Sequence, residues 1–545
     1  MKKILSLLAA FGVMFTISSC GDDDDPSADN GVTITGIPAV AEIDNLGTYT
    51  ATATIEAKDG LAALTVTKNG GTFAAEVYTG ETSTSYTFTY TAAADEADAN
   101  ITFAFNATDN DGDTETATLV LSVGDAPAPV VNQVLSGKIS SDMTLTADRV
   151  WELSGKVVVD AGVTLTIEPG TIIKGRKGEG SLASALIVAQ GGKIMAEGTA
   201  QKPIVFTSEL DNIGVGQSMG TSLDETDRGL WGGVIILGKA PISADAEAVQ
   251  IEGIPADEAF GKYGGTIADD NSGTFKYVSI RHGGSLIGEG NEINGLTLGG
   301  VGSATTIEFI EVVGNNDDGI EWFGGTVNVT NALVWSQADD AFDIDQAYAG
   351  TIDNIVYIAG DESDHALEID GAEGTTNASF TMMNGSFKGT GDKEAEYADF
   401  RDGAMGTVKD LYFFGFHPKA DVELDADGSV DPADNTKKLS NNPATSDNYK
   451  GGSLIITGLE FSNKAADDSE VVIGSIFADK WKLAPSTESF DPTDSRSDSD
   501  ATTQAAANKT TFNTNNTVVS SATVGADMTK FDWTYAKAKG ALTGF

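Results

Sequence analysis

A four-residue motif recurs along the middle of the chain at nearly constant spacing. The segments 294–297, 318–321, 340–343 and 365–368 match position for position, with separations of 24, 22 and 25 residues. A period of about 20 to 50 residues is typical of stacked repeats. Strand patterns fill the intervals and helical patterns are almost absent. The repeat therefore predicts a β-solenoid, in which each coil buries its inner face against its neighbours.

The N-terminal part of the chain has a different rhythm. Segments such as "YTATATIEA", "SYTFTYTA" and "TATLVLSV" within residues 31–123 place apolar residues at every second position, the period of a half-buried strand. About seven such strands, separated by turn sequences, predict a β-sandwich, and the last hairpin resembles those of immunoglobulin- or cadherin-like modules. A Pro/Ala linker follows at 124–133. We therefore expect an all-β chain in which the solenoid occupies 134–545.

The acidic turn "DNDGD" closes the last hairpin of the expected sandwich. Asp109, Asp111 and Asp113 alternate in it, as oxygen ligands of calcium can do. Asp-Gly and Asn-Asp-Gly sequences also form hairpin turns, and do so more often. The sequence leaves both interpretations open.

The first thirty residues predict export and lipid anchoring. Lys2 and Lys3 precede a fourteen-residue apolar stretch, which is short for a membrane span and fits a signal peptide. The segment "ISSC" resembles a bacterial lipobox, so we expect residues 1–19 to be removed and Cys20, the single cysteine of the chain, to be acylated. Residues 20–30 are an acidic tether, which resembles the surface-export signal of Bacteroidota lipoproteins.

Several longer motifs support a family assignment. "GVTLTIEPGTIIKG", "KPIVFTS", "RGLWGGVIILG", "EINGLTLGGVG" and "NDDGIEWFGGTVNV" together resemble a family of Bacteroidota surface lipoproteins with a β-helix domain. The resemblance implies a right-handed, pectin-lyase-like parallel β-helix. Two polar, turn-rich insertions near 425–452 and 484–516 are expected to be loops outside this solenoid.

Composition excludes several classes of function. The formal net charge is −48, with 33 Lys and Arg against 81 Asp and Glu, and a field of this sign repels nucleic acid. A single cysteine excludes a disulfide framework and thiolate metal centres. Three histidines leave few candidates for a histidine-rich metal site.

The repeat register predicts a ladder of carboxylates on the outside of the solenoid. Ile320, Phe342 and Leu367 share an inward position, so the next residues should point outward and stack about 4.8 Å apart. The expected set is Glu321, Asp343 and Glu368, with Asp345 and Asp370 two residues further on. Like charges at this spacing repel each other, and calcium would relieve the repulsion because it prefers oxygen ligands. Arg401 is an alternative partner if its coil aligns under Glu368.

Other residues near the ladder are candidates for ligand binding. Asp339 and Asp340 resemble the paired aspartates of polygalacturonases, although the Gly-His-Gly segment of those enzymes is missing. Asp residues at coil corners also bind backbone groups without any further role. With the same register, Trp335 and Tyr357 are expected outside, where a ring can stack on a sugar, while Trp322 is expected inside. His365 and Arg401 complete the candidate ligand-binding residues.

These observations lead to one expected function and two alternatives. We expect a lipid-anchored protein of the outer membrane, exposed at the cell surface, that binds a glycan or a partner surface protein without catalysis. Calcium is the one cofactor expected, and a SusC/SusD-like system is a possible partner. The alternatives are a polysaccharide lyase or glycoside hydrolase on the same scaffold, since carboxyl groups about 5 to 5.5 Å apart suit retaining hydrolysis, and a structural surface-layer component.

Overall fold

The computed structural model divides the chain into two compact units, one ending at Val131 and the other beginning at Asn132. The residues that it describes are 31–93, 96–97, 99–124, 132–244, 246–255, 258–286, 293–391, 395–425, 430–431, 434–438, 444–480 and 498–545. Cys20 and the acidic tether, most of the 124–133 linker, and parts of the two insertions lie outside these residues. No helix among the described residues is long and apolar enough to cross a membrane.

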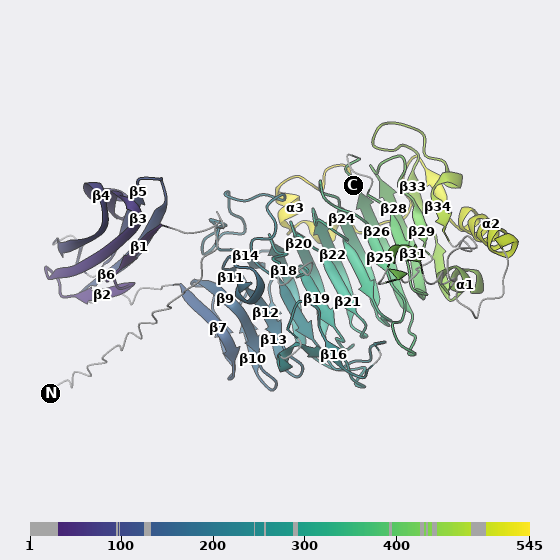
Figure 1. The fold of residues 1–545 in the computed structure, drawn as a ribbon, viewed down its shortest axis with the longest axis horizontal. Coiled ribbons are helices and arrows are strands. Elements are labelled where there is room, and N and C mark those ends of the chain that lie inside the picture. Colours follow the sequence, from purple (N-terminus) through teal and green to yellow (C-terminus); the bar gives the residue numbers. More distant parts are fainter. Residues whose placement is uncertain are drawn as a thin grey trace. The chain divides into compact units, whose positions relative to one another are not determined.

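The first unit contains six strands around one apolar core (Figure 1). They are β1 (Val32–Thr35), β2 (Val40–Ile43), β3 (Thr48–Lys68), β4 (Gly71–Thr91), β5 (Asn100–Asp109) and β6 (Thr114–Val123). The strand order is β1-β3-β5-β6-β2, with β4 paired to β3. Six strands form instead of about seven because β3 and β4 are each continuous over 21 residues. The register of β3 shifts between Glu56 and Leu61, which is the mark of a β-bulge.

The second unit is a parallel β-helix whose 25 strands form one continuous ladder (Figure 1). Its first coils contain β7 (Gln133–Ile139), β8 (Met143–Leu145), β9 (Val150–Val159), β10 (Thr164–Ile167), β11 (Ile172–Gly175), β12 (Ala185–Val188), β13 (Lys193–Glu197), β14 (Ile204–Ser208) and β15 (Val234–Leu237). A small hairpin, β16 (Val249–Gln250) with β17 (Lys262–Tyr263), lies outside this ladder. The expected fold class is confirmed.

Long and short strands alternate through the middle of the β-helix. The long strands are β18 (Gly273–Arg281), β20 (Thr306–Val313), β22 (Asn328–Trp335), β24 (Thr351–Ile358), β26 (Phe380–Lys388) and β28 (Gly406–Phe414). The short strands are β19 (Leu296–Gly299), β21 (Ile320–Phe323), β23 (Phe342–Asp345), β25 (Leu367–Ile369), β27 (Ala398–Phe400) and β29 (Val422–Leu424). Leu296, Ile320, Phe342 and Leu367 pair in register, so the alignment of the repeat is confirmed.

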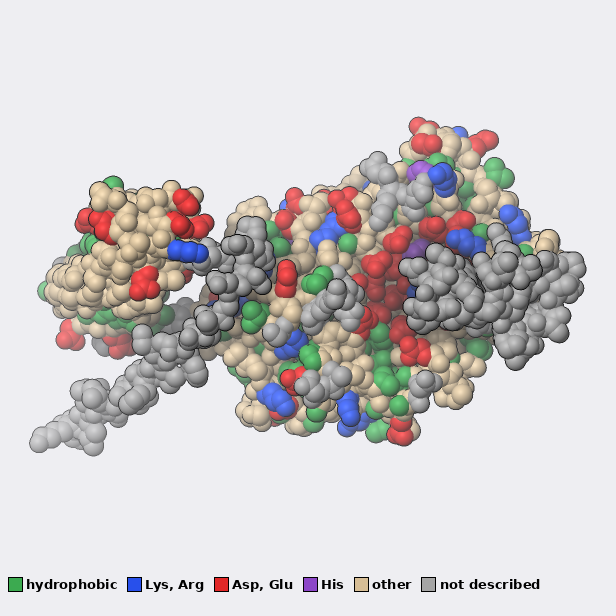
Figure 2. Space-filling model, in the orientation of Figure 1, with side chains coloured by type: hydrophobic (Ala, Val, Ile, Leu, Met, Phe, Trp, Pro, Cys, Tyr) green, Lys and Arg blue, Asp and Glu red, His purple; other side chains and the backbone are tan. Residues whose placement is uncertain are grey.

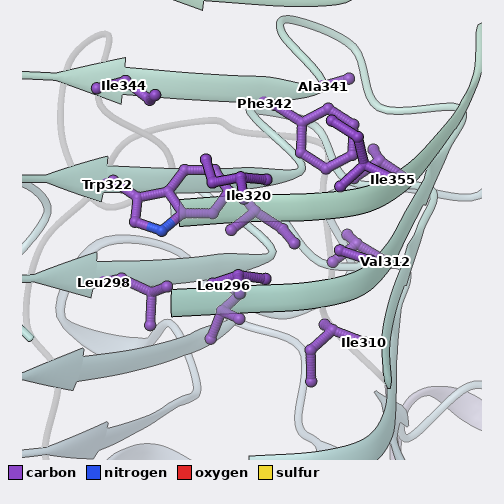
Figure 3. Packing of buried hydrophobic residues seen from close by; sticks show 14 of the residues in the cluster. Leu296, Leu298, Ile310, Val312, Ile320, Trp322, Ala341, Phe342, Ile344 and Ile355 are labelled. Carbon is purple, nitrogen blue, oxygen red and sulfur yellow. The ribbon is translucent and has the colours of Figure 1, made fainter. Parts of the chain in front are cut away.

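Apolar side chains from these strands stack inside the coils. Figure 3 shows Leu296, Ile320 and Phe342 at equivalent positions of successive strands, with Trp322 beside them. Trp322 is fully buried, as expected from its position in the repeat. Each coil therefore covers the apolar face of the next, which explains why the solenoid needs no disulfide.

Each long strand contains one non-glycine residue in the left-handed backbone region. Asn331, Asn354 and Asn384 have φ values of 59°, 59° and 58° at stacked positions, and the Asn354 Nδ2 donates to the Asn331 Oδ1 at 2.6 Å. Asn tolerates this conformation better than most residues. This left-handed residue interrupts the alternation of inward and outward side chains. Alternation alone therefore does not predict which way the residues after it point.

Two helices close the C-terminal end of the β-helix (Figure 1). The last coils contain β32 (Leu454–Thr457), β33 (Glu460–Ser462), β34 (Phe477–Asp479) and β35 (Thr517–Val519), with the hairpin β30 (Val430–Asp431) and β31 (Asp434–Lys438). Helix α1 (Ala444–Gly451) contacts α2 (Asp498–Asn515), and Phe512 of α2 stacks on Phe477 in the core. The expectation that 425–452 and 484–516 are only loops is wrong, because both contain helices that cover the exposed end of the stack.

Residues 520–545, which we call the C-terminal strap, return along the outside of the β-helix (Figure 1). The strap includes a short helix, α3 (Tyr535–Ala538). Backbone NH groups of Tyr535 and Ala536 donate to the Glu311 carboxylate at 3.0 and 2.8 Å. Phe531 and Tyr535 pack against Trp335 and its apolar neighbours. The strap thus covers apolar side chains that the coils leave on their outer side.

Candidate functional site: a buried acidic row on the β-helix

Five carboxylates stack on successive short strands of the β-helix. The register pairs Glu321 with Asp343, Asp343 with Glu368, Glu368 with Asp399, and Asp399 with Glu423. We call these five side chains the acidic row. Sequence reasoning found the first three members and missed Asp399 and Glu423, because the spacing widens to 31 residues before β27.

A second row runs parallel to the acidic row, two residues further along each strand. Asp345, Asp370 and Arg401 directly follow aligned core residues, and the Arg401 NH donates to the Ile369 carbonyl at 2.8 Å. Arg401 therefore lies beside Asp370, while Asp399 takes the position opposite Glu368. The expected alignment of Arg401 under Glu368 is wrong by two residues, which preserves its outward direction.

The acidic row is on the outer side of the strands, yet it is buried. Glu321, Asp343, Asp399 and Glu423 are only 5%, 7%, 6% and 5% exposed. Figure 2 shows Asp and Glu side chains gathered in a band on this face, with a histidine and basic side chains beside one end. Burial matters because an ionised carboxylate taken out of water must find a proton, a cation or hydrogen-bond donors.

The residues at the coil corner before each short strand form a hydrogen-bonded chain. The Asp318 Oδ1 accepts the Asp340 NH at 3.0 Å, and the Asp340 Oδ1 accepts the His365 NH at 2.7 Å. The backbone-binding interpretation of these aspartates is therefore confirmed. The Asp340 Oδ1 also lies 2.8 Å from the His365 Nδ1, so Asp340 additionally orients an imidazole. Asp339, next to it, is exposed.

Cations neutralise the half of the site that contains Glu368. The Arg401 Nη1 lies 2.8 Å from the Glu368 Oε1, and the Arg401 Nε lies 2.8 Å from the Asp370 Oδ1. Burial lowers the pKa of His365, but its hydrogen bond to Asp340 and nearby acidic charges raise it to about 10. Burial and the charge of Asp340 raise the pKa of Glu368 to about 9, against the opposing effect of Arg401. Further along, Lys480 pairs with Glu423.

The other half of the site has no such cation. Asp318, Glu321 and Asp343 form no ion pair with a described Lys, Arg or His. Burial, followed by the charges of neighbouring carboxylates, raises the pKa of all three well above the usual range. Without a cation, the raised pKa values favour the protonated form of these carboxyl groups. Asn294 donates to Glu321.

One oxygen in this half has no hydrogen-bond partner. The Asp343 Oδ1 is buried and unpartnered among the described residues. One oxygen from each of Asp318, Glu321 and Asp343 lies within 4.8 Å of the other two. Oxygens bound to one calcium ion at 2.3 to 2.6 Å lie up to about 5 Å apart, so these three fit a hard divalent cation and contain no ligand typical of a transition metal.

A pocket of about 570 Å³ lies beside the second row. The Gln346 Nε2 donates to the Tyr263 Oη at 2.8 Å and to the Glu373 Oε2 at 3.1 Å, and the Gln346 Oε1 is buried without a partner. Burial raises the pKa of Asp345 to about 7, assisted by the charges of Asp370 and Glu373. The polar and aromatic residues that line the pocket are Glu252, Tyr263, Phe323, Asp345, Gln346 and Glu373.

Neither of the two expected aromatic platforms is available. Tyr357 is fully buried in the core, because Asn354 in the left-handed region shifts the alternation and pairs Tyr357 with Val334. Trp335 does point outward, but the C-terminal strap covers it, with the Tyr535 ring centroid 6.0 Å away. The prediction of sugar stacking on these two side chains is therefore wrong.

The chain belongs to the family of pectate-lyase-like β-helix domains, whose family model matches residues 137–536. A similar solved structure is the catalytic unit of the thermostable GH87 α-1,3-glucanase from Streptomyces thermodiastaticus strain HF3-3. The two chains are 10% identical, and the similarity covers 85% of this chain and 88% of that chain with a TM-score of 0.26. Comparison with curated proteins found no match. Family membership establishes the β-helix fold.

Proposed function

We propose that this protein is a lipid-anchored outer-membrane protein of Bacteroidota type that binds a polysaccharide at the cell surface with the help of calcium. The anchor would be Cys20, which follows a signal peptide and precedes an acidic tether. The binding surface would be the acidic row together with the pocket beside the second row.

The unpartnered Asp343 Oδ1 carries the calcium part of this proposal. A buried acceptor without a donor is costly, and here it lies among carboxylates that repel each other. A cation bound by Asp318, Glu321 and Asp343 would remove both costs. Oxygen-only ligands favour calcium, which accepts irregular coordination more readily than magnesium does.

The pocket supports a carbohydrate ligand rather than an apolar one. Its polar lining offers carboxylates that can accept hydroxyl hydrogen bonds, and the Phe323 and Tyr263 rings lie 5.8 Å apart at its wall. Small-molecule sites usually combine apolar surface with a few fixed polar groups. A sugar residue fits this combination, and bound calcium nearby would contribute a further ligand for hydroxyl or carboxylate oxygens.

Calcium titration tests the metal site directly. Binding to the native state alone stabilises it by about 2.7 kcal/mol at a hundredfold excess over Kd, so millimolar CaCl₂ should raise the melting temperature of the mature protein. Asp343→Asn should abolish most of this rise, whereas Asp269→Asn, which changes an exposed carboxylate outside the site, should keep it. A wild-type melting curve insensitive to calcium would refute the site.

Polysaccharide binding needs a separate measurement. Affinity electrophoresis against acidic and neutral polysaccharides, with CaCl₂ or with EGTA, should show calcium-dependent retardation by at least one of them. Asp343→Asn should lose the calcium dependence, and Phe323→Ala should weaken retardation in both conditions by removing a wall of the pocket. If no polysaccharide slows the wild-type protein although calcium binds, the carbohydrate part of the proposal fails.

The anchor is tested by cell fractionation. Cys20→Ala should move the protein from the outer membrane to a soluble fraction, because a stable anchor requires the acyl chains. The matched control for Cys20→Ala is Ser19→Ala, which keeps the cysteine whose thiol is expected to be acylated. Retention of the Cys20 variant in salt-washed outer membranes would contradict lipidation.

Glycoside hydrolysis is a second candidate because of the spacing of the carboxylates. Oxygens of Glu321 and Asp343 lie within 4.8 Å of each other, close to the carboxyl separation of retaining glycosidases. Release of reducing sugar from a polysaccharide panel would support this candidate. Activity lost in both Glu321→Gln and Asp343→Asn, with binding retained, would favour it over the non-catalytic proposal.

A further inference from the structure

The N-terminal unit holds a second convergence of carboxylates, remote in sequence from the acidic row. Asp109 ends β5, Asp113 precedes β6, and Asp59 lies at the bulge of β3. A Cβ atom placed on Gly31 would lie 3.0 Å from the Asp109 Oδ2, 3.4 Å from the Asp59 Oδ2 and 3.6 Å from the Asp113 Oδ2. Three carboxylate oxygens therefore face one small space beside Gly31, where a Cβ atom would crowd the Asp109 Oδ2.

The backbone holds this arrangement in place. The Asn110 NH donates to the Gly60 carbonyl at 2.9 Å, and the Asn110 Nδ2 donates to the Asp59 carbonyl at 3.1 Å. The β5–β6 turn is thereby tied to the bulge of β3. The Lys58 NH donates to the Gly31 carbonyl at 2.7 Å, which brings the start of the unit to the same place.

Asp109 has one satisfied and one unsatisfied oxygen. Its Oδ1 accepts the NH groups of Asp111, Gly112 and Asp113 at 3.1, 2.9 and 2.8 Å. Its Oδ2 has no hydrogen-bond partner, although the residue is only 2% exposed. A turn-forming aspartate needs only the first oxygen, so the turn interpretation leaves the second one unexplained. That oxygen faces the same space as the Asp59 and Asp113 oxygens.

We infer that Asp59, Asp109 and Asp113 bind a divalent cation, calcium by its oxygen-only ligands, at the start of the N-terminal unit. None of the three carboxylates forms an ion pair with a described basic residue, so a bound cation would supply the positive charge that these residues lack. The ion would connect the entry of the chain at Gly31 with β3 and with the β5–β6 turn. It would thus fasten the unit where the expected membrane tether joins it.

Equilibrium dialysis of the mature full-length protein against radioactive CaCl₂ tests this inference. Asp109→Asn should bind one calcium ion fewer per chain than the wild type, and its Oδ1 can still accept the three turn NH groups. Asp59→Asn should also lose this ion; its side chain is exposed, so folding should be unaffected even if Asp109→Asn is unstable. Asp44→Asn removes an exposed carboxylate of the same unit and should bind as much calcium as the wild type.

The outcome is distinguishable from that of the acidic row. If only the N-terminal site exists, Asp109→Asn and Asp59→Asn lose calcium while Asp343→Asn does not; if only the acidic row binds, the reverse holds. Undiminished binding in Asp59→Asn and in a folded Asp109→Asn, checked by near-ultraviolet circular dichroism, would overturn the inference.

Discussion

The two halves of the acidic site differ in how buried carboxylates are neutralised. Around Glu368 and Asp370, Arg401 contributes a fixed positive charge from the next coil, and the pKa of His365 is raised to about 10. Around Glu321 and Asp343, in the two preceding coils, the described residues form no ion pair, and burial raises the pKa of both carboxyl groups. The same fold and the same stacking distance therefore support one half with cations beside its carboxylates and one half without them.

This difference separates structural from functional carboxylates. A fixed guanidinium stays with its partners whatever the solution contains, so Glu368 and Asp370 are expected to stabilise the coil stack. A proton can be replaced by a cation or a ligand, so Asp343 and its neighbours are expected to respond to pH and calcium. Variants that remove either a cation or a carboxylate test this division into structural and functional carboxylates.

The largest effect is expected from Arg401→Met. Without the guanidinium, Glu368 and Asp370 are left as buried carboxylates of like charge, and breaking a buried pair in this way costs about 3 kcal/mol. The free energy of unfolding in urea measures the loss. Arg176→Met is the matched control, because its pair with Glu152 is at the surface and should contribute less than about 1 kcal/mol. Equal losses in the two variants would contradict a structural role for Arg401.

A pH dependence is expected from the half without a cation. The pKa of Asp345 is raised from 3.8 to about 7 in the folded state, so the folded protein holds this proton more tightly than the unfolded chain does. The contribution of Asp345 to the free energy of unfolding is therefore fully present below about pH 4, and it is lost as the pH rises to about 7.

Asp345→Asn should remove this part of the pH dependence in calcium-free protein. The difference in the free energy of unfolding between wild type and variant should change by on the order of 2 kcal/mol between these pH values. This figure is lowered to account for partial contact of Asp345 with solvent. Urea unfolding at a series of pH values measures it, with Asp269→Asn as the control for a solvent-exposed carboxylate. A pH profile with the same slope in Asp345→Asn and wild type would show that Asp345 is not perturbed by burial.

The main features of the β-helix could be predicted from the sequence because they follow from periodicity. The recurrence that aligns Leu296, Ile320, Phe342 and Leu367 fixes which residues stack, and strand alternation fixes that the next residue in each coil points outward. The first three members of the acidic row follow from these two rules. Asp399 and Glu423 lie beyond a widened interval, where counting residues no longer gives the register.

The features that were missed depend on contacts distant in the sequence or on special backbone conformations. Tyr357 is inside because Asn354 adopts φ of 59°, and alternation holds only while the backbone stays extended. Trp335 is covered by a strap nearly two hundred residues later in the chain, for which no local pattern gives a signal. Helix α2 was detectable, since its "ATTQAAANKTTF" segment is rich in Ala and lacks Gly and Pro.

A smaller effect of opposite sign is expected for Asp343→Asn in calcium-free protein at pH 9. At this pH Asp343 is ionised more readily than at neutral pH, and the ionised carboxylate then repels Asp318 and Glu321. Replacing it with the neutral amide should raise the free energy of unfolding by on the order of 1 kcal/mol. Glu368→Gln should raise it less, because Arg401 already offsets part of the cost of ionising Glu368. An equal or larger gain in Glu368→Gln at pH 9 would contradict the division into two halves.

The smallest effect is expected at the far end of the acidic row, from Lys480→Met. Lys480 pairs with the buried Glu423, yet its side chain is 45% exposed, so water already screens part of the interaction. Exposed pairs contribute about 0.2 to 1 kcal/mol, and the loss should be near 0.5 kcal/mol because the long lysine side chain recovers rotamer freedom when the pair is broken. Urea unfolding in low and high salt measures it: the loss should shrink in 1 M NaCl for Lys480→Met, since salt screens exposed charges, and persist more fully for Arg401→Met, whose side chain is 31% exposed against 45% for Lys480. A loss of similar size and salt resistance in both variants would show that the exposure of the cation does not decide how strongly each carboxylate is held.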